Sequence, residues 1–241
     1  MKNHTHIKEE VCKANLRLKT EALVVLTWGN VSAIDRAQGL VAIKPSGMPY
    51  DRLSPEHIVL VDLESGQPVE EDSLNPSSDT PTHLELYRNF PGIGSIVHTH
   101  SLQATGWAQA CTEIPVFGTT HADYFSNSIP CTRIMWPEEV QTDYELNTGK
   151  LIVECFKDLD PMLCPAVLVA HHGPFVWGKN PEEAVANAIV LEQVALMATQ
   201  TRLIKPNAHY IPQHLLNKHF SRKHGSDAYY GQKEGPGSKK S

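Results

Sequence analysis

The chain has 241 residues, of which 41% are hydrophobic and 20% charged, and its formal net charge is −6 at pH 7. This composition is that of an ordinary globular protein, and the acidic balance argues against nucleic-acid binding, which requires a basic face. No apolar run approaches the ~20 residues needed to span a bilayer, and the amino-terminal stretch lacks the apolar core of a signal peptide. No linker divides the chain, so we expect one domain over residues 1–232 and a disordered polar tail over residues 233–241.

The cysteines are few and scattered, without a CxxC pair, and their number is odd. Such a pattern is typical of reduced thiols in a cytoplasmic protein rather than of a disulfide framework. We therefore expect a cytoplasmic location and free thiols at Cys12, Cys111, Cys131, Cys155 and Cys164.

The first predicted elements are a helix followed by two strands. Apolar residues recur at helical spacing from Ile7 to Leu18, which predicts an amphipathic helix. The apolar, β-branched run Leu23–Thr27 predicts a buried strand, and Leu40–Ile43 predicts another. Residues 57–69 then read as a hairpin that turns at Ser65-Gly66.

The central part of the chain alternates helices and strands. Thr80 can cap a helix whose first turn contains Pro81, and the stretch 93–100 predicts a strand followed by a helix over residues 101–110. Residues 166–173, "AVLVAHHG", predict a further buried strand. Asn180, Pro181 and two acidic residues then begin a long apolar helix. This alternation predicts an α/β domain with a central β-sheet flanked by helices.

Two histidines, His98 and His100, close one of the predicted strands. Because strand side chains alternate, both would lie on one face about 7 Å apart, close enough to bind one metal ion. The favoured third ligand is His172, with His171 as the alternative, since it also follows a buried strand. Asp79 offers a carboxylate, although it could instead be a helix cap. Three imidazoles and one oxygen suit zinc, with manganese as the second choice.

Three loops are rich in small and hydroxyl residues, in the stretches "LTWGNVS", "IKPSGM" and "NPSSDTP". A bound phosphate needs backbone N–H groups, hydroxyls and usually a cation, so these loops are candidates for a phosphate site. None matches a nucleotide-binding glycine motif, which disfavours a nucleotide. The candidate donors are Gly29, Asn30, Lys44, Ser46, Gly47, Ser77 and Ser78.

Taken together, these stretches resemble the class II aldolase-like zinc enzymes over residues 26–232. "IVHTHS" and "HGPFVWGK" are shared broadly in that family, whereas "GTTHADYF" and the terminal "AYYGQ" are more typical of its epimerase branch. The resemblance implies zinc held by His98, His100 and His172, with Asp79 at the metal. It also implies that the three loops bind a phosphorylated sugar.

The resemblance further implies the residues that act on the substrate. Asp123 and Tyr230 would be the acid/base pair, although Tyr229 is an alternative to Tyr230. Four further residues would lie near the sugar or assist from the carboxy-terminal segment: Thr119, Glu145, His219 and Arg222. In the family that segment reaches a neighbouring subunit of a homotetramer, so the active site would be shared between chains.

The implied reaction interconverts L-ribulose 5-phosphate and D-xylulose 5-phosphate, as in arabinose catabolism or ascorbate-type catabolism. The C4 hydrogen is not acidic, so inversion at C4 requires that the C3–C4 bond break and re-form on the other face. One alternative is a sugar-phosphate aldolase of the same family. Another is a non-catalytic interaction module on this fold, which would be expected to lose the metal ligands.

Overall fold

The computed structural model describes residues 4–225 and residue 228. Within this part of the chain, the backbone forms one six-stranded sheet in the order β3-β2-β1-β4-β6-β5, and every neighbouring pair is antiparallel. Helices cover the sheet, which confirms the expected α/β domain. The expected tail over residues 233–241 lies outside the described residues.

The strands are short and their interiors are apolar. Their bounds are β1 Asn30–Asp35, β2 Leu40–Ile43, β3 Val59–Asp62, β4 Ser95–His98, β5 Ala166–Val169 and β6 Gly173–Gly178. In the register of the sheet, Asn30 at the start of β1 pairs with His98 at the end of β4, and His98 in turn pairs with Phe175 of β6. One end of the sheet therefore gathers the first residues of β1 and β6 and the last residue of β4.

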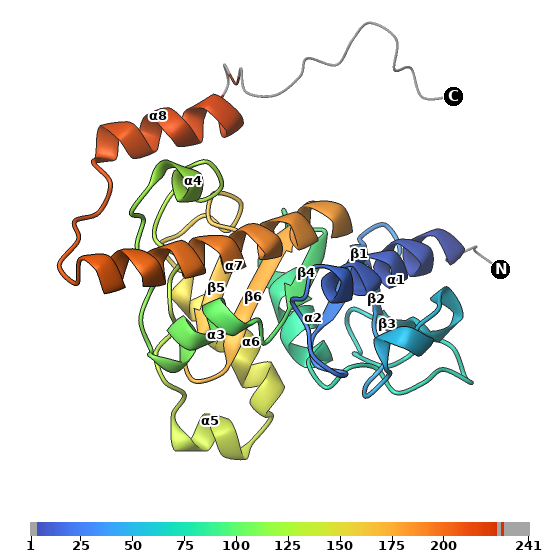
Figure 1. Cartoon of the computed structure of the whole chain (residues 1–241). Coiled ribbons are helices and arrows are strands. Elements are labelled where there is room, and N and C mark those ends of the chain that lie inside the picture. Colours follow the sequence, from blue (N-terminus) through green and yellow to red (C-terminus); the bar gives the residue numbers. More distant parts are fainter. Residues whose placement is uncertain (1–3, 226–227, 229–241) are drawn as a thin grey trace, which may run out of the picture.

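The helices fall into two layers and a small outlying pair. Their bounds are α1 Thr5–Thr20, α2 Thr80–Asn89, α3 Leu102–Gln109, α4 Thr119–Ala122, α5 Pro137–Gln141, α6 Tyr144–Cys155, α7 Pro181–Ile204 and α8 Gln213–His224, with single 3-10 turns η1 Tyr50–Arg52 and η2 Pro55–His57. Figure 1 shows α1 and α7 on the near face of the sheet, while α2 and α6 pack together on the far face. The carboxy-terminal α8 lies beside α4 at one side of the molecule.

The main core lies between the sheet and both helical layers. Alternation in β1 directs Val31 toward α1 and Ser32 toward α2. On the far face, the largest fully buried side chains include Tyr87 of α2 and Trp177 of β6. Fully burying side chains of this size stabilises a fold by about 2–3 kcal/mol each.

Most predicted elements are confirmed, but the strand expected over Leu23–Thr27 is wrong. Residues 23–29 form a loop, in which Val25 and Leu26 are exposed and Leu26 has a φ of 54°. A left-handed backbone at a leucine is incompatible with a strand. Leu23 is still buried in the core and Val24 packs against it, so only the first part of this apolar run serves core packing. The first strand instead begins at Asn30, in a stretch whose polar residues face a buried polar layer.

Two boundaries also differ in detail. Asp79, rather than Thr80, occupies the position before α2, and Pro81 lies in the first turn as expected. The predicted hairpin is shorter than expected. The chain turns at Ser65-Gly66 after β3, but its returning segment forms only one isolated β-bridge, between Val61 and Pro68. The cap of α7 is confirmed, since the Asn180 side chain accepts a hydrogen bond from the Glu183 N–H.

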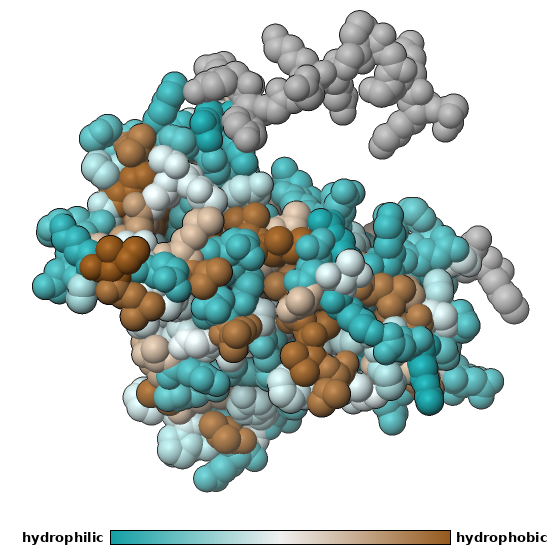
Figure 2. Space-filling model, viewed as in Figure 1, coloured by the Kyte–Doolittle hydropathy of each residue, from teal (hydrophilic) through white to brown (hydrophobic). Residues whose placement is uncertain are grey.

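The surface viewed in Figure 2 is largely hydrophilic, with apolar side chains in separate patches. One patch covers the carboxy-terminal end of α7, where Leu203 and Ile204 are exposed. One face of α7 is covered within the chain itself by α1, α3 and the sheet. Among the described residues, no helix combines the length and the apolar character that crossing a membrane requires.

Candidate active site

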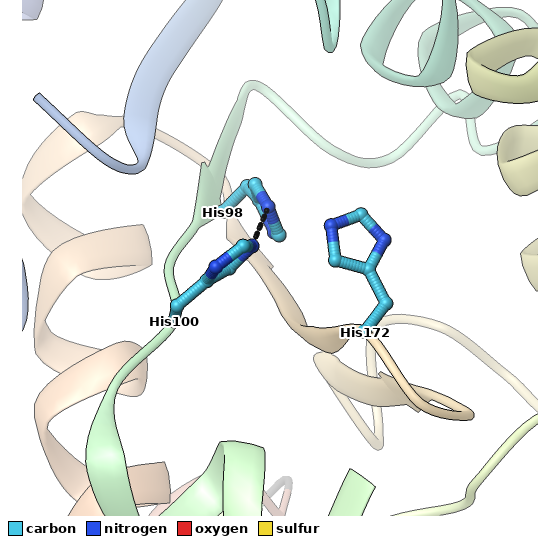
Figure 3. Close-up of side chains that lie close together, drawn as sticks. All are labelled: His98, His100 and His172. Carbon is cyan, nitrogen blue, oxygen red and sulfur yellow. Dashed lines mark hydrogen bonds between the residues drawn. The ribbon is translucent and has the colours of Figure 1, made fainter. Parts of the chain in front are cut away.

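Three histidines converge at the end of the sheet where β4 stops. His98 is the last residue of β4, His100 lies two residues beyond it, and His172 lies in the turn between β5 and β6. One nitrogen from each ring lies within 4.8 Å of the others, and the ring centroids are 4.8–5.1 Å apart. Figure 3 shows the His172 ring facing the other two from the opposite side. His100 lies beyond the end of β4, contrary to the expectation that both histidines close the strand, but the two rings still lie at one site.

The orientation of His98 is set by its neighbours. Its Nδ1 lies 3.0 Å from the carbonyl oxygen of Pro174, so Nδ1 carries the proton and donates it to that oxygen. The ring also stacks on Phe175, with centroids 4.2 Å apart. Nε2 is therefore left as the lone-pair nitrogen, and it lies 3.2 Å from Nε2 of His100. This arrangement, in which one ring nitrogen is fixed by an outer hydrogen bond, is typical of metal-binding histidines.

His172 and His100 are kept in the neutral form that binds metals. Burial, together with His98 and His100, lowers the pKa of His172 to about 3. Burial and then His98 lower the pKa of His100 as well. The Tyr144 hydroxyl, at the start of α6, lies 3.3 Å from Nδ1 of His172 and fixes that ring from outside. Neutral imidazoles at neutral pH leave their lone pairs available for a cation.

The donor set fits a divalent metal ion. Two nitrogens bonded to one tetrahedral zinc at ~2.0–2.1 Å would lie about 3.3 Å apart, which agrees with the 3.2 Å between the Nε2 atoms of His98 and His100. The choice of third histidine also becomes clear. His171 has a φ of 61° and its ring contacts the Cys111 sulfur at 3.2 Å, so it faces away from the group that His172 joins.

Asp79 lies beside this group but outside the cluster of three. Its carboxylate accepts a hydrogen bond of 2.7 Å from the Asn30 side chain and makes no capping bond to α2. Burial favours a higher pKa for Asp79, but His98, His83 and the Asn30 hydrogen bond outweigh it, and the net shift is downward. Asp79 is therefore a half-buried carboxylate held in its ionised form at the edge of the site.

The three loops expected to bind phosphate come together beside Asn30. The loops after β2 and before α2 are joined by a bridge between Pro45 and Pro76 and by a hydrogen bond from the Ser77 N–H to the Lys44 carbonyl. The Asn30 side chain donates to the Ser77 hydroxyl at 3.0 Å. These contacts bring together four of the sequence-predicted residues, namely Asn30, Lys44, Ser46 and Ser77. The other three, Gly29, Gly47 and Ser78, adjoin them in the chain.

Lys44 is an unusual member of this group, because a lysine is rarely buried without a carboxylate in contact. It is 2% exposed, and its ammonium group donates to the carbonyl oxygens of Thr27 at 3.3 Å and Pro45 at 3.5 Å. Its Nζ also lies 4.9 Å from the centre of the Tyr50 ring. Burial lowers the pKa of Lys44 to about 8, against the attraction of Asp79. A buried cation of this kind is suited to an anionic ligand.

Glu145 lies at the start of α6, next to Tyr144. Its backbone carbonyl accepts a hydrogen bond from the Thr82 hydroxyl of α2. Glu145, Ser77 and Ser78 line one surface hollow of about 500 Å³. The glutamate expected near the sugar therefore shares a hollow with two of the phosphate-loop serines.

A second polar cluster lies between α4 and α8. The Asp123 carboxylate accepts hydrogen bonds from Nε and Nη2 of Arg222, at 3.0 and 2.6 Å, and from His219 Nδ1 at 3.0 Å. Asp123 is buried, and although burial favours a higher pKa, Arg222 and His219 outweigh it and lower the pKa. Thr119 begins α4 and its carbonyl accepts from the Asp123 N–H.

This second cluster is separate from the three histidines. Within residues 4–225 and 228, no hydrogen bond or ring contact connects Asp123, His219 or Arg222 to His98, His100 or His172. The two candidates Tyr229 and Tyr230 lie outside the described residues. The sequence-predicted residues therefore form two groups in one chain, one around the histidines and one on α4 and α8.

Two contributors to the site were missed from the sequence. Tyr144 had no signal, because nothing in its local pattern relates it to His172, which follows 28 residues later. The Pro174 carbonyl is backbone, and only the pairing of β4 with β6 brings it to His98. Both depend on tertiary structure.

The sheet, the helical layers and the three-histidine group define an α/β protein with a candidate metal centre at the ends of its strands. Residues 9–199 match the family model described as the class II aldolase and adducin N-terminal domain. The chain belongs to this family.

Solved structures with the same fold are similar over nearly the whole chain. An L-fuculose 1-phosphate aldolase is 24% identical, with a TM-score of 0.77 over 91% of this chain and 97% of that one. YgbL from Klebsiella pneumoniae, described as a putative aldolase/epimerase/decarboxylase, is 22% identical, with a TM-score of 0.68 over 88% and 97%. The L-fuculose-1-phosphate aldolase from Thermus thermophilus is 21% identical, with a TM-score of 0.66 over 83% and 97%.

Proposed function

We propose that the chain is an L-ribulose-5-phosphate 4-epimerase, an isomerase that interconverts L-ribulose 5-phosphate and D-xylulose 5-phosphate. The observation that carries the proposal is the convergence of His98, His100 and His172 next to a phosphate-type cradle that contains the buried Lys44. Membership of the class II aldolase family supports chemistry on a sugar phosphate. The motifs "GTTHADYF" and "AYYGQ" favour the epimerase branch.

In this proposal His98, His100 and His172 hold one Zn²⁺, with Mn²⁺ as the second choice, and Asp79 lies at its edge. The bound cation supplies Lewis acidity for the negative charge that develops on the sugar oxygens when C3–C4 breaks. The outer contacts from Pro174 and Tyr144 keep two of the three rings oriented before any ligand arrives.

The phosphate loops have a specific task in epimerisation. Cleavage of C3–C4 leaves glycolaldehyde phosphate, which must turn and re-add through its other face without leaving. Lys44, the backbone around Gly29 and Gly47, and the Ser77 and Ser78 hydroxyls would hold its phosphate during this rotation. Retention of the fragment is what separates an epimerase from an aldolase.

The protons at the C4 oxygen would be handled by Asp123 and Tyr230, one on each face of the carbon. Asp123 is ionised and held by Arg222 and His219, so it can accept a proton. Because this group lies apart from the histidines of its own chain, we propose that it acts at the site of a neighbouring subunit in a homotetramer. The site would then be complete only at the interface between chains.

A sugar-phosphate aldolase is the second candidate, because two of the similar solved structures are described as L-fuculose 1-phosphate aldolases. Their identity to this chain is low enough to support the fold alone. A non-catalytic module is disfavoured, since all three histidines are present and oriented.

The deciding experiment is product analysis with L-ribulose 5-phosphate and the Zn²⁺-loaded protein. We expect D-xylulose 5-phosphate without accumulation of free glycolaldehyde phosphate. Release of glycolaldehyde phosphate and dihydroxyacetone would assign an aldolase, and no turnover of this substrate with Zn²⁺ or Mn²⁺ would refute the epimerase assignment.

A further inference from the structure

A second buried polar layer lies beneath Asp79, between α2 and β1. Asp79, His83 and Tyr87 are spaced four residues apart and therefore share one face of α2. Asn30 and Ser32 share the facing side of β1. The Asn30 side chain contacts Asp79, and Ser32 contacts both His83 and Tyr87. A continuous polar ladder thus leads from the edge of the metal centre into the core.

The hydrogen bonds of this ladder define the protonation of His83. The Ser32 hydroxyl oxygen lies 2.7 Å from His83 Nδ1 and 2.7 Å from the Tyr87 hydroxyl. If Tyr87 donates to Ser32 and Ser32 donates to Nδ1, both hydroxyl hydrogens have an acceptor. Every arrangement in which Nδ1 donates leaves a buried hydroxyl hydrogen, either that of Tyr87 or that of Ser32, without an acceptor among the described residues, which is costly. Nδ1 is therefore the acceptor, and the proton of the neutral ring is on Nε2.

The Nε2–H group of His83 is left as a donor in need of a partner. His83 is fully buried, and its Nε2 has no hydrogen-bond partner among the described residues. Burial lowers the pKa of His83 to about 3, although the attraction of Asp79 acts in the other direction. The ring is thus neutral, and Asp79 is a carboxylate close enough to act on it. An unpaired buried N–H costs about 1–3 kcal/mol. Asp79 lies beyond direct hydrogen-bond reach of Nε2, so a water molecule that bridges the two groups would remove this cost.

We propose that His83 is a positioning residue, which holds the Asp79 carboxylate toward the three histidines through the N–H on Nε2 and one bridging water molecule. Asn30 already donates to one oxygen of the same carboxylate at 2.7 Å. Two donors would fix its orientation and offset the cost of burying its charge. The inference rests on the proposed function in one respect, namely that Asp79 lies at a bound metal ion.

This role can be separated from a merely structural one by matched substitutions. His83→Gln places an amide N–H near the position of Nε2, whereas His83→Leu removes every donor at similar size. Tyr87→Phe is the control, because it shortens the same ladder at its far end and leaves the His83 N–H in place. The readout is the dissociation constant for Zn²⁺, measured by competition with a chromogenic chelator, together with the unfolding midpoint of each variant.

We expect His83→Leu to weaken Zn²⁺ binding about tenfold, at the low end of the range for outer contacts of a metal site. The Zn²⁺ dissociation constant of His83→Gln should stay within about threefold of that of the unsubstituted protein. The dissociation constant of Tyr87→Phe should equal that of the unsubstituted protein. Neither result should depend on the unfolding midpoint of the variant. Equal Zn²⁺ affinity for His83→Leu and the unsubstituted protein would overturn the proposal. Equal losses in all three variants would also overturn it, since they would show a structural effect.

A second readout needs neither metal nor variants at His83. In the metal-free protein, ¹⁵N NMR of the imidazoles should show the His83 proton on Nε2, and its resonance should move in Asp79→Asn. A proton on Nδ1, or a resonance that Asp79→Asn leaves unchanged, would contradict the inference. If the protein bound no Zn²⁺ at all, the proposed function would fail, while this measurement would still decide the role of His83.

Discussion

Gly29 packs directly against the backbone of His98. A Cβ atom built on Gly29 would lie 2.7 Å from the His98 carbonyl oxygen and 3.3 Å from the Thr99 Cα atom, and the φ of Gly29 is +75°. The residue that leads the first phosphate-type loop into β1 therefore touches the residue that ends β4 at the candidate metal centre. The position of this loop is therefore coupled to the position of His98, a candidate metal ligand, through backbone contact.

The first prediction concerns Gly29→Ala, with Gly39→Ala as its matched control. Gly39 has a φ of +65° and nothing within 4 Å of an added Cβ, so its substitution adds only the left-handed strain of about 1–2 kcal/mol. Gly29→Ala adds a backbone clash to that strain, and we expect it to lower the free energy of unfolding by about 3 kcal/mol or more. Urea denaturation measures both values. If both variants lost the same free energy of unfolding, the contact between Gly29 and the His98 backbone would not contribute to stability.

The second prediction concerns the charge of Lys44. Burial lowers its pKa from 10.5 to about 8, so the unfolded chain binds more protons than the folded one between these values. Stability contributed by this group therefore rises as pH increases from 8 to 10.5, and its full cost is present below pH 8. We expect Lys44→Met to raise the free energy of unfolding at pH 7 by up to about 3 kcal/mol, measured by urea denaturation.

Substrate affinity should change with pH in the opposite direction to the stability contributed by Lys44. The affinity for L-ribulose 5-phosphate should fall as pH rises above about 8, because Lys44 becomes neutral. Lys44→Met should bind the phosphate ester at least about tenfold more weakly at pH 7 and show little of this pH dependence. A titration of KM against pH tests both points. Unchanged KM in Lys44→Met would exclude Lys44 from phosphate binding.

The third prediction concerns Tyr144, whose hydroxyl lies 3.3 Å from Nδ1 of His172. Tyr144→Phe removes this outer contact and keeps the ring, so we expect Zn²⁺ binding about tenfold weaker in a folded protein. The control is Tyr210→Phe, which removes the exposed hydrogen bond to Glu113 and should leave Zn²⁺ affinity unchanged. A similar affinity in both variants would show that Tyr144 does not support the metal centre.

The fourth prediction tests whether the site is shared between chains. His98→Asn and Asp123→Asn should each abolish turnover, for different reasons. Co-assembly of equal amounts should restore about a quarter of the original activity, because only sites that pair intact histidines with a neighbour's Asp123 can work. Mixing His98→Asn with His100→Asn is the control and should restore none. No recovery in the first mixture, in spite of verified co-assembly, would place the complete site within one chain.

Much of the fold was predictable because it depends on local pattern. The helix at Ile7–Leu18 and the strand Leu40–Ile43 follow from apolar periodicity, which the structure uses directly for core packing. The run Leu23–Thr27 shows the limit of that reasoning, since apolar residues in an exposed loop have the same composition as a buried strand. The antiparallel order of the sheet also has no local signal.

The candidate site divides in the same way. The His98–His100 pair and the hydroxyl-rich loops were visible because each is a short sequence motif. The choice of His172 over His171 needed the turn between β5 and β6, which directs His171 to Cys111 instead. His83 carried a weak signal, its spacing of four residues from Asp79, but its meaning depends on the facing residues of β1.

The most direct test of the metal centre is an anomalous difference map from crystals of the protein loaded with Zn²⁺, recorded at the zinc absorption edge. We expect one strong peak per chain between His98, His100 and His172, about 2.0–2.1 Å from a nitrogen of each ring. A map with no peak among these rings, or with the zinc bound elsewhere on the chain, would contradict the three-histidine centre on which the proposed chemistry depends.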